Sequence, residues 1–456
     1  MKIKGILSLL LVTVMLLTIC GCSGGKGDDS KGNDKVSVND MVKEGTAPVE
    51  EGLDFGGKTV TYAIGLPLSS TMQRQLISFE KKYNCKVETD LLGFLDYVQI
   101  LASRMAGGKV YDIIQLEGIR FPSIAISNFV EPLEDVITTA DWAGDDYTKG
   151  GFVKDETMKF VWGKHLYAVV CSQGEFSSKV GYLAYNKKIF EAAGAEDPRE
   201  LYEKGKWNWD AFEEAGKKIR DNTDSHITGY RHIDTVLGYN GADTYDFSDP
   251  DNPKSNLSAP ENINKYTFLQ KTLSGNDPIV IIDGDHTPAT FFEGKIAMFP
   301  CAVFELYDNY RIGAGVEASN AFNRSLDNLG IVPCLLGPDN KEGVRPITSC
   351  MYGIAAGSGT SDPKIAMAFA KHSSTFSTVA RDGDYKYNEA DTKLLLELQK
   401  EKKTGLSHEF SDGSNSVSDL LNQFKHDVQE GGDIAQLVAT YDAQIQNCID
   451  VMMSQQ

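Results

Sequence analysis

The sequence predicts an α/β protein of two lobes, each a doubly wound sheet flanked by helices, and three observations support this prediction. The chain has 456 residues, which at about 150 residues per domain suggests two or three domains. Strand-like and helix-like segments alternate from residue 57 to residue 116, and a similar alternation resumes near residue 180. Such alternation favours right-handed crossovers and a doubly wound sheet.

The first alternating region predicts five elements in order. We expect strands at 57–65, 85–90 and 110–116, because these runs are rich in β-branched or apolar residues. We expect helices at 71–82 and 95–105, because their apolar residues recur at helical spacing. The second helix is followed by a pair of glycines, which favours its termination there.

The rest of the chain predicts a second set of elements. Strands are expected at 180–185, 296–299, 329–332 and 352–356, and helices at 187–194, 209–220, 266–273, 362–372 and 434–453. Asn208 is placed to cap the helix that follows it, and Gly194 to end the helix before it. Two α/β lobes fit this number of elements better than one.

Composition and charge exclude several classes of protein. Lys and Arg number 45 and Asp and Glu number 64, so the formal charge is 45 − 64 = −19. A nucleic-acid-binding role is disfavoured, because this field repels phosphates. A polytopic membrane protein is disfavoured too, because only one apolar run is membrane-directed.

That apolar run is at the N-terminus and predicts a signal peptide over residues 1–21. Lys2 and Lys4 precede the run, which covers 6–19 and is shorter than the ~20 residues that a spanning helix needs. The segment Ile19-Cys20-Gly21-Cys22 resembles the lipobox of bacterial lipoproteins, in which the last Cys receives a diacylglycerol. We therefore expect lipid attachment at Cys22 and a location on the extracytoplasmic face of the cell membrane. Residues 22–55, rich in Gly, Ser, Asp and Lys at their start, are expected to form a flexible tether.

No cofactor or metal is expected. The six cysteines after the lipobox are scattered and form no C-x-x-C or Cys/His cluster, and the sequence selects no disulfide pairing among them. The acidic stretch 243–251 lacks the Gly and the terminal Glu of an EF-hand loop.

Six motifs occur in a recognisable order. They are Met-Ala-Gly-Gly-Lys-Val-Tyr-Asp at 105–112, Tyr-Asn-Lys-Lys-Ile-Phe at 185–190, Trp-Asn-Trp-Asp at 207–210, Phe-Phe-Glu-Gly-Lys-Ile-Ala-Met at 291–298, Gly-Ile-Val-Pro at 330–333 and Gly-Ile-Ala-Ala-Gly at 353–357. Together they resemble the family 1 extracellular solute-binding proteins of bacterial ABC importers, over roughly residues 57–450. Two departures are Tyr111, where the family usually has Pro or Gly, and Val303-Phe304, where Gly-Trp is usual.

This resemblance implies the two-lobed periplasmic-binding-protein fold, with a carbohydrate bound in a cleft between lobes and delivered to a membrane permease. It implies one lobe of 56–172 plus 352–395 and another of 173–351 plus 396–456. A monomeric, non-enzymatic protein that does not bind nucleic acid is expected.

The candidate ligand-binding residues follow from where strands end. In open α/β sheets, ligands bind beyond the carboxyl ends of strands, where polar groups can meet sugar hydroxyls and aromatic faces can pack on the pyranose ring. Phe304 takes the place of the family's stacking Trp by resemblance. The other candidates are Ser69, Glu117, Arg120, Gln173, Glu175 and Tyr352.

Two other classes of function share some of these features. A secreted glycoside hydrolase would need two carboxyl groups about 5 to 9.5 Å apart, and the many acidic residues leave that open. No G-x-S-x-G, H-E-x-x-H or Walker A pattern occurs. A sugar-sensing lipoprotein that partners a sensor kinase would have the same fold and differ only in its partner.

Overall fold

The structure is a computed structural model in which most of the chain after residue 40 is described. The described residues are 41–68, 70–93, 96–143, 150–171, 182–246, 249, 252–273, 278–281, 288–301, 328–343, 352–381, 390–391, 393–394, 397 and 416–454.

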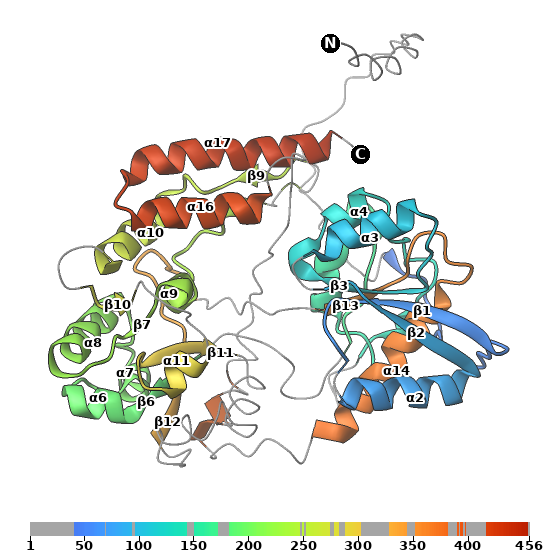
Figure 1. Ribbon diagram of the computed structural model, residues 1–456, viewed down its shortest axis with the longest axis horizontal. Helices are drawn as coiled ribbons and strands as arrows, with labels where there is room; N and C mark the ends of the chain where they lie inside the picture. The colour runs from blue at the N-terminus through green and yellow to red at the C-terminus, as the bar shows by residue number, and fades with distance from the viewer. Residues whose placement is uncertain are drawn as a thin grey trace, which may run out of the picture. The chain divides into compact units, whose positions relative to one another are not determined.

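The first lobe is built on a four-stranded sheet in the order β13-β3-β1-β2 (Figure 1). Strands β1 (Lys58–Ile64), β2 (Cys85–Leu91) and β3 (Ile113–Glu117) are parallel, and β13 (Tyr352–Ala355) runs antiparallel to β3. The predicted strands at 57–65, 85–90 and 352–356 are confirmed. The strand predicted at 110–116 begins only at Ile113.

Helices cover both faces of this sheet, as the alternation predicted. Helix α2 (Ser70–Tyr83) and helix α14 (Lys364–Arg381) lie on one face, and α3 (Tyr97–Ala106) and α4 (Ser123–Ile126) lie on the other (Figure 1). Aromatic rings join α2 and α14 to the sheet. The centroid of the Phe369 ring lies 5.0 Å from the ring centroid of Tyr62 and 5.3 Å from that of Phe79. Burying aromatic surface of this kind stabilises the contact of helix with sheet.

Tyr111, which departs from the family motif, is fully buried and lies two residues before β3. Its hydroxyl donates a hydrogen bond of 2.6 Å to Asp90, which also pairs with Arg104 of α3. The departure therefore gives β2 and α3 a shared polar contact.

The second lobe has a sheet centred on β6 (Tyr182–Asn186). Strands β11 (Met298–Cys301) and β12 (Leu329–Pro333) both pair antiparallel to β6. Next to β11, a parallel bridge joins His226 to Ile296, and β7 (Thr228–Gly229) then pairs parallel with β10 (Val280–Ile281). The strands expected at 180–185, 296–299 and 329–332 are thus present, each shifted by at most two residues.

Each sheet contains one strand that runs against its neighbours, a feature that the alternation did not predict. These strands are β13 and β6, and each is the first strand of its sheet that the chain forms after leaving the other sheet. A strand joined to its neighbour through a crossover helix of the same sheet runs parallel to that neighbour. A strand that enters from the other sheet is not bound in this way and can run antiparallel.

The helices of the second lobe begin and end at recognisable signals. Helix α6 (Lys187–Ala193) ends at Gly194, whose φ of 65° is left-handed, and α8 (Trp209–Asn222) is capped by Asn208, whose side chain accepts from the amide of Ala211 at 3.0 Å. Both signals were predicted. Helix α10 (Pro260–Leu273) begins six residues earlier than expected.

The C-terminal helices pack on α10 through aromatic rings. Helix α16 (Val417–Gln429) presents Phe424 to Tyr266 of α10, with ring centroids 4.6 Å apart. Helix α17 (Ile434–Met453), whose bounds were predicted, presents Tyr441 to the same Phe424 at 5.5 Å.

The remaining elements are short. They are α5 (Lys154–Thr157), α7 (Pro198–Glu203), α9 (Tyr230–Leu237), α11 (Pro288–Phe292), β4 (Val161–Trp162), β5 (His165–Leu166), β8 (Tyr245–Asp246), β9 (Lys254–Ser255) and the 3-10 turns Gly118–Arg120, Thr139–Asp141 and Met158–Phe160.

Part of the expected tether is packed against the first lobe. Phe55 stacks on Tyr83 at 5.7 Å, its amide donates to the carbonyl of Tyr83, and Val42 is buried. Residues 41–55 are therefore ordered by contacts with this lobe, because a few of their apolar side chains find partners there.

Three further observations concern only the described part of the chain. The side chains of Cys85, Cys171, Cys334 and Cys448 are buried thiols. Among described residues, no group of three or more His, Cys, Asp and Glu side chains is arranged to hold a metal ion. None of the described helices combines the length and the apolar character required to span a bilayer.

Candidate functional site

The carboxyl end of the first sheet brings three of the predicted ligand-binding residues together. Glu117 is the last residue of β3, and Arg120 ends the 3-10 turn that follows directly. Because β13 runs antiparallel to β3, its first residue, Tyr352, pairs with Glu117 in the strand register. One edge of the sheet thus carries a carboxylate, a guanidinium and a phenol.

Glu117 and Arg120 form a buried ion pair. Arg120 Nε lies 2.8 Å from Glu117 Oε2, and the side chains are only 10% and 3% exposed. Two charges removed from water in this way need good geometry and further hydrogen bonds to offset the lost hydration. The short turn Gly118–Arg120 supplies that geometry, since it places the two side chains three residues apart on one side of a tight turn.

Tyr97, the first residue of α3, packs its ring against the Arg120 guanidinium. The guanidinium carbon lies 5.1 Å from the centre of the Tyr97 ring, within the range of a cation–π interaction. The Tyr97 hydroxyl donates a hydrogen bond of 2.7 Å to the carbonyl of Gln115 on β3. The ring is therefore fixed to the strand whose end carries the ion pair.

Only one of the two carboxylate oxygens of Glu117 accepts a hydrogen bond. Glu117 Oε1 is buried and has no hydrogen-bond partner in the structure, while Oε2 accepts from Arg120. Burial raises the pKa of Glu117 above its usual value, and the neighbouring Arg120 opposes that rise. An unpaired buried oxygen is costly, so a donor that reached it would be bound favourably.

Gly65, just after β1, leaves the space next to this oxygen. A Cβ atom at position 65 would lie 3.2 Å from Glu117 Oε1 and 3.5 Å from the Tyr97 ring. The Gly65 amide donates to the side-chain oxygen of Gln115 at 3.2 Å. The loop after β1 therefore passes close to the ion pair because residue 65 has no side chain.

Exposed aliphatic side chains follow the same strand ends. Leu66 after β1 is 46% exposed, Ile119 after β3 is 41% exposed, and Leu91 at the end of β2 is 49% exposed. The carboxyl end of the sheet thus combines a buried ion pair with exposed apolar surface. Such a combination can bind a small molecule that has hydroxyl groups on one side and C–H groups on another.

The other predicted residues lie outside the described part of the chain. These are Ser69, Gln173, Glu175, Phe304 and the lipid-attachment residue Cys22. Their roles stay predictions.

Sequence reasoning missed Tyr97 and Gln115, and it placed Gly65 at the end of the first strand without giving it a role. Tyr97 is a buried aromatic at the start of a helix, a pattern that any core residue shows. Gln115 and Gly65 are joined by a hydrogen bond from the Gly65 amide to the Gln115 side chain, and this contact depends on the register of β1 and β3. The position of Gly65 directly after a strand was the only available signal.

Comparison with known proteins gives a consistent assignment. The family described as bacterial extracellular solute-binding protein matches residues 67–374. A comparison with curated proteins finds no significant match.

Solved structures share the fold at low sequence identity. The GacH receptor of Streptomyces glaucescens, solved unliganded and with acarbose, is 17% identical with a TM-score of 0.62, covering 86% of this chain and 99% of that one. The galacto-N-biose-/lacto-N-biose I-binding protein of the ABC transporter from Bifidobacterium longum, with lacto-N-biose, is 14% identical with a TM-score of 0.62, covering 88% and 98%. UgpB from Mycobacterium tuberculosis, with glycerophosphocholine, is 16% identical with a TM-score of 0.60, covering 86% and 98%.

These likenesses confirm the predicted α/β, two-lobed periplasmic-binding-protein fold. The family match covers well over half of the chain. The chain belongs to the bacterial extracellular solute-binding protein family.

Proposed function

We propose that this protein captures a carbohydrate at the carboxyl end of its first sheet and delivers it to the permease of an ABC importer. Capture proceeds by closure of the two lobes and involves no covalent chemistry. The protein is held at the outer face of the cell membrane by a lipid on Cys22.

The observation that carries the proposal is the buried Glu117–Arg120 pair next to Tyr352. Charged and planar groups of this kind hydrogen-bond sugar hydroxyls strongly, because at least one partner is ionised. Glu117 Oε1 has no hydrogen-bond partner and can accept from a ligand hydroxyl, and Leu66 and Ile119 offer apolar surface at the same end of the sheet. The acarbose and lacto-N-biose complexes of the related structures support a sugar as the ligand.

A thermal-shift screen tests the ligand class. The panel contains mono- and oligosaccharides, sugar alcohols, glycerophosphocholine, amino acids, peptides and polyamines. A ligand at 100 times its Kd stabilises the folded state by about 2.7 kcal/mol, which such a screen detects. We expect a shift with one or more sugars. A shift with peptides or amines and none with sugars would overturn the carbohydrate proposal.

The same samples test the absence of catalysis. The stabilising oligosaccharide is incubated with the protein and analysed by chromatography. Recovery of the intact sugar is expected, and its hydrolysis would favour the glycoside-hydrolase alternative.

Detergent phase partitioning tests the anchor. The protein should enter the detergent phase, and a Cys22→Ser variant should stay in the aqueous phase, because lipid chains supply the affinity for a bilayer. Equal partitioning of both forms would refute lipid attachment at Cys22.

A further inference from the structure

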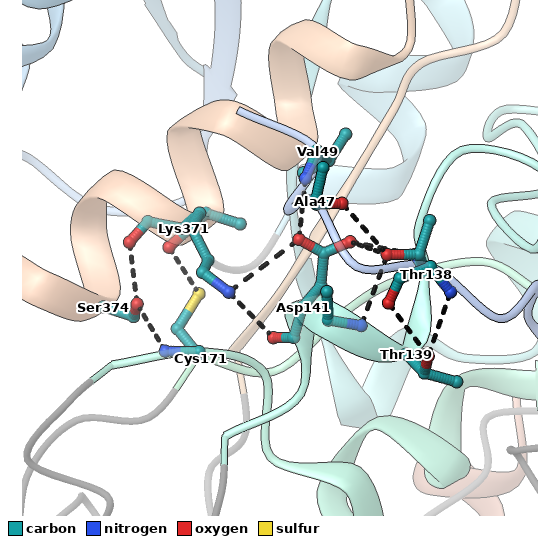
Figure 2. A network of polar contacts seen from close by, with 12 residues as sticks. Ala47, Val49, Thr138, Thr139, Asp141, Cys171, Lys371 and Ser374 are labelled. Atoms are coloured by element: carbon teal, nitrogen blue, oxygen red, sulfur yellow. Dashed lines mark hydrogen bonds and ion pairs between the residues drawn. The ribbon is translucent and has the colours of Figure 1, made fainter. Parts of the chain in front are cut away.

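Residues 42–49, here called the N-terminal strap, lie across a turn of the first lobe. The turn is formed by Thr138 and the 3-10 helix Thr139–Asp141 (Figure 2). Composition alone had assigned the strap to a flexible tether. Its contacts instead form a connected set around one buried carboxylate.

Asp141 is fully buried and binds the strap directly. Its Oδ1 accepts a hydrogen bond of 2.8 Å from the backbone amide of Val49, and its Oδ2 accepts one of 2.8 Å from the amide of Thr138 (Figure 2). A buried carboxylate requires such partners, because leaving it without them costs several kcal/mol. The strap therefore supplies one of the donors on which the buried charge depends.

The backbone of the strap pairs with the same turn at several points. Lys43 forms a parallel bridge with Thr138, and the amide of Thr139 donates to the carbonyl of Lys43 at 3.1 Å. The amide of Gly45 donates to Thr139 Oγ1 at 3.2 Å, and Thr138 Oγ1 donates to the carbonyl of Ala47 at 3.3 Å.

Gly45 lies so close to the side chain of Thr138 that position 45 has no room for a side chain of its own. A Cβ atom on Gly45 would lie 2.7 Å from the Cβ of Thr138, well inside contact distance.

The network continues into helix α14. Lys371 donates to the carbonyl of Asp141 at 3.1 Å and lies 3.8 Å from Asp141 Oδ1. One turn later, Ser374 accepts from the amide of Gly151 at 2.9 Å (Figure 2). The strap is therefore joined, through one carboxylate, to a helix of the core of the lobe.

We propose that Asp141, Thr138 and Thr139 form a clasp that holds the strap and thereby fixes the point at which the lipid-anchored chain leaves the first lobe. The proposal rests on the lipid anchor at Cys22. The stretch of chain between the anchor and the folded lobe then covers 23–40, which is 40 − 22 = 18 residues, rather than the 55 − 22 = 33 residues that composition suggested. The clasp thus brings the first contact with the lobe 33 − 18 = 15 residues closer to the anchor along the chain.

A Val49→Pro variant tests the clasp at one hydrogen bond. The amide of Glu51 donates to the carbonyl of Pro48, so Val49 occupies the second position of a β-turn, which proline favours. The variant keeps the turn and Asp141 but removes the donor. Val49→Ala, which retains the amide, is the matched control.

The readout is trypsin cleavage after Lys43 in the full chain in liposomes, with the new N-terminus identified by mass spectrometry. A hydrogen bond to a charged group contributes about 1.5 kcal/mol or more, so we expect cleavage about tenfold or more faster in Val49→Pro than in Val49→Ala. Cleavage of both at the rate of the unaltered chain would overturn the proposal.

Gly45→Ala provides a second, independent route. The added methyl group meets Thr138 and should displace the strap, again accelerating cleavage after Lys43. Glu51→Ala, an exposed change outside the segment that trypsin recognises around Lys43, should leave the rate unchanged. Cleavage of Gly45→Ala no faster than that of Glu51→Ala would contradict the clasp even if Val49→Pro failed to fold.

Sugar binding and anchoring are scored separately on the same variants. Both strap variants should keep the thermal shift of the unaltered protein and its detergent partitioning. A failure of the sugar screen or of the Cys22→Ser test therefore leaves the cleavage result interpretable.

Discussion

Replacing Arg120 by Met should destabilise the protein strongly, because it leaves Glu117 buried without a counter-charge. The two side chains are 10% and 3% exposed, so solvent screens their interaction little. Breaking a buried pair by removing one partner costs about 3–5 kcal/mol, and we expect a loss of that size in the free energy of unfolding. Met fills much of the same volume, so the effect reports on charge more than on packing.

The loss of stability in Arg120→Met should grow as the pH rises. Burial already raises the pKa of Glu117, and loss of Arg120 removes the influence that opposes the rise. The folded state then disfavours the charged carboxylate, so stability is retained below about pH 4.5 and is lost as the pH rises through the raised pKa. The difference between Arg120→Met and the unaltered protein should therefore be small at pH 4.5 and large at pH 7.5.

Urea unfolding followed by circular dichroism at the two pH values measures the effect. The double variant Glu117→Gln, Arg120→Met should recover much of the loss, because no buried charge remains. Lys204→Met is the control, since it breaks an exposed pair with Glu200 and should have no resolvable effect. A loss at pH 7.5 of less than about 1 kcal/mol in Arg120→Met would refute the burial of the pair.

Three other changes test separate parts of the structure. Asp234→Asn should destabilise the second lobe, because the Asp234 carboxylate oxygens lie 2.7 Å from Nζ of both Lys265 and Lys425. These lysines hold the pKa of Asp234 well below its usual value. Urea unfolding should therefore show a loss in the free energy of unfolding that shrinks as the pH falls. Gly330→Ala should prevent stable folding, because its Cβ would lie 2.1 Å from the ring of Tyr185, and soluble yield measures this; a normal yield would contradict the packing of β12 on β6. Phe304→Ala should weaken sugar binding at least tenfold in calorimetry with an unchanged melting temperature, and an unchanged affinity would remove Phe304 from the site.

Local sequence patterns predicted helix ends well where the end depends only on neighbouring residues. The cap at Asn208 and the stop at Gly194 were found because each depends on a few neighbouring residues. The position of Glu117 and Arg120 at the carboxyl end of the sheet could be predicted because they lie at the end of an apolar run, and their role in binding stays a prediction. The structure places both there, next to Tyr352.

Features that depend on distant partners were not predictable. The direction of β6 depends on strands more than a hundred residues away in the chain. Tyr97 has the pattern of any core aromatic, and its role depends on where Arg120 turns back. The strap was missed because its composition is polar, and only the position of Asp141, over ninety residues later, gives its amides a partner.

The reversed strand β13 has a consequence for how the protein is made. Until β13 emerges, one side of β3 presents unpaired amides and carbonyls, a template for pairing with other chains. From Glu117 to Ala355 the chain runs for 355 − 117 = 238 residues, which takes about 12–48 s at 5–20 residues per second. The sheet of the first lobe therefore cannot be completed, with Tyr352 in place, until the part of the second lobe that precedes β13 has been synthesised. A truncated chain that stops before residue 352 should aggregate through that open strand, however well its own helices form.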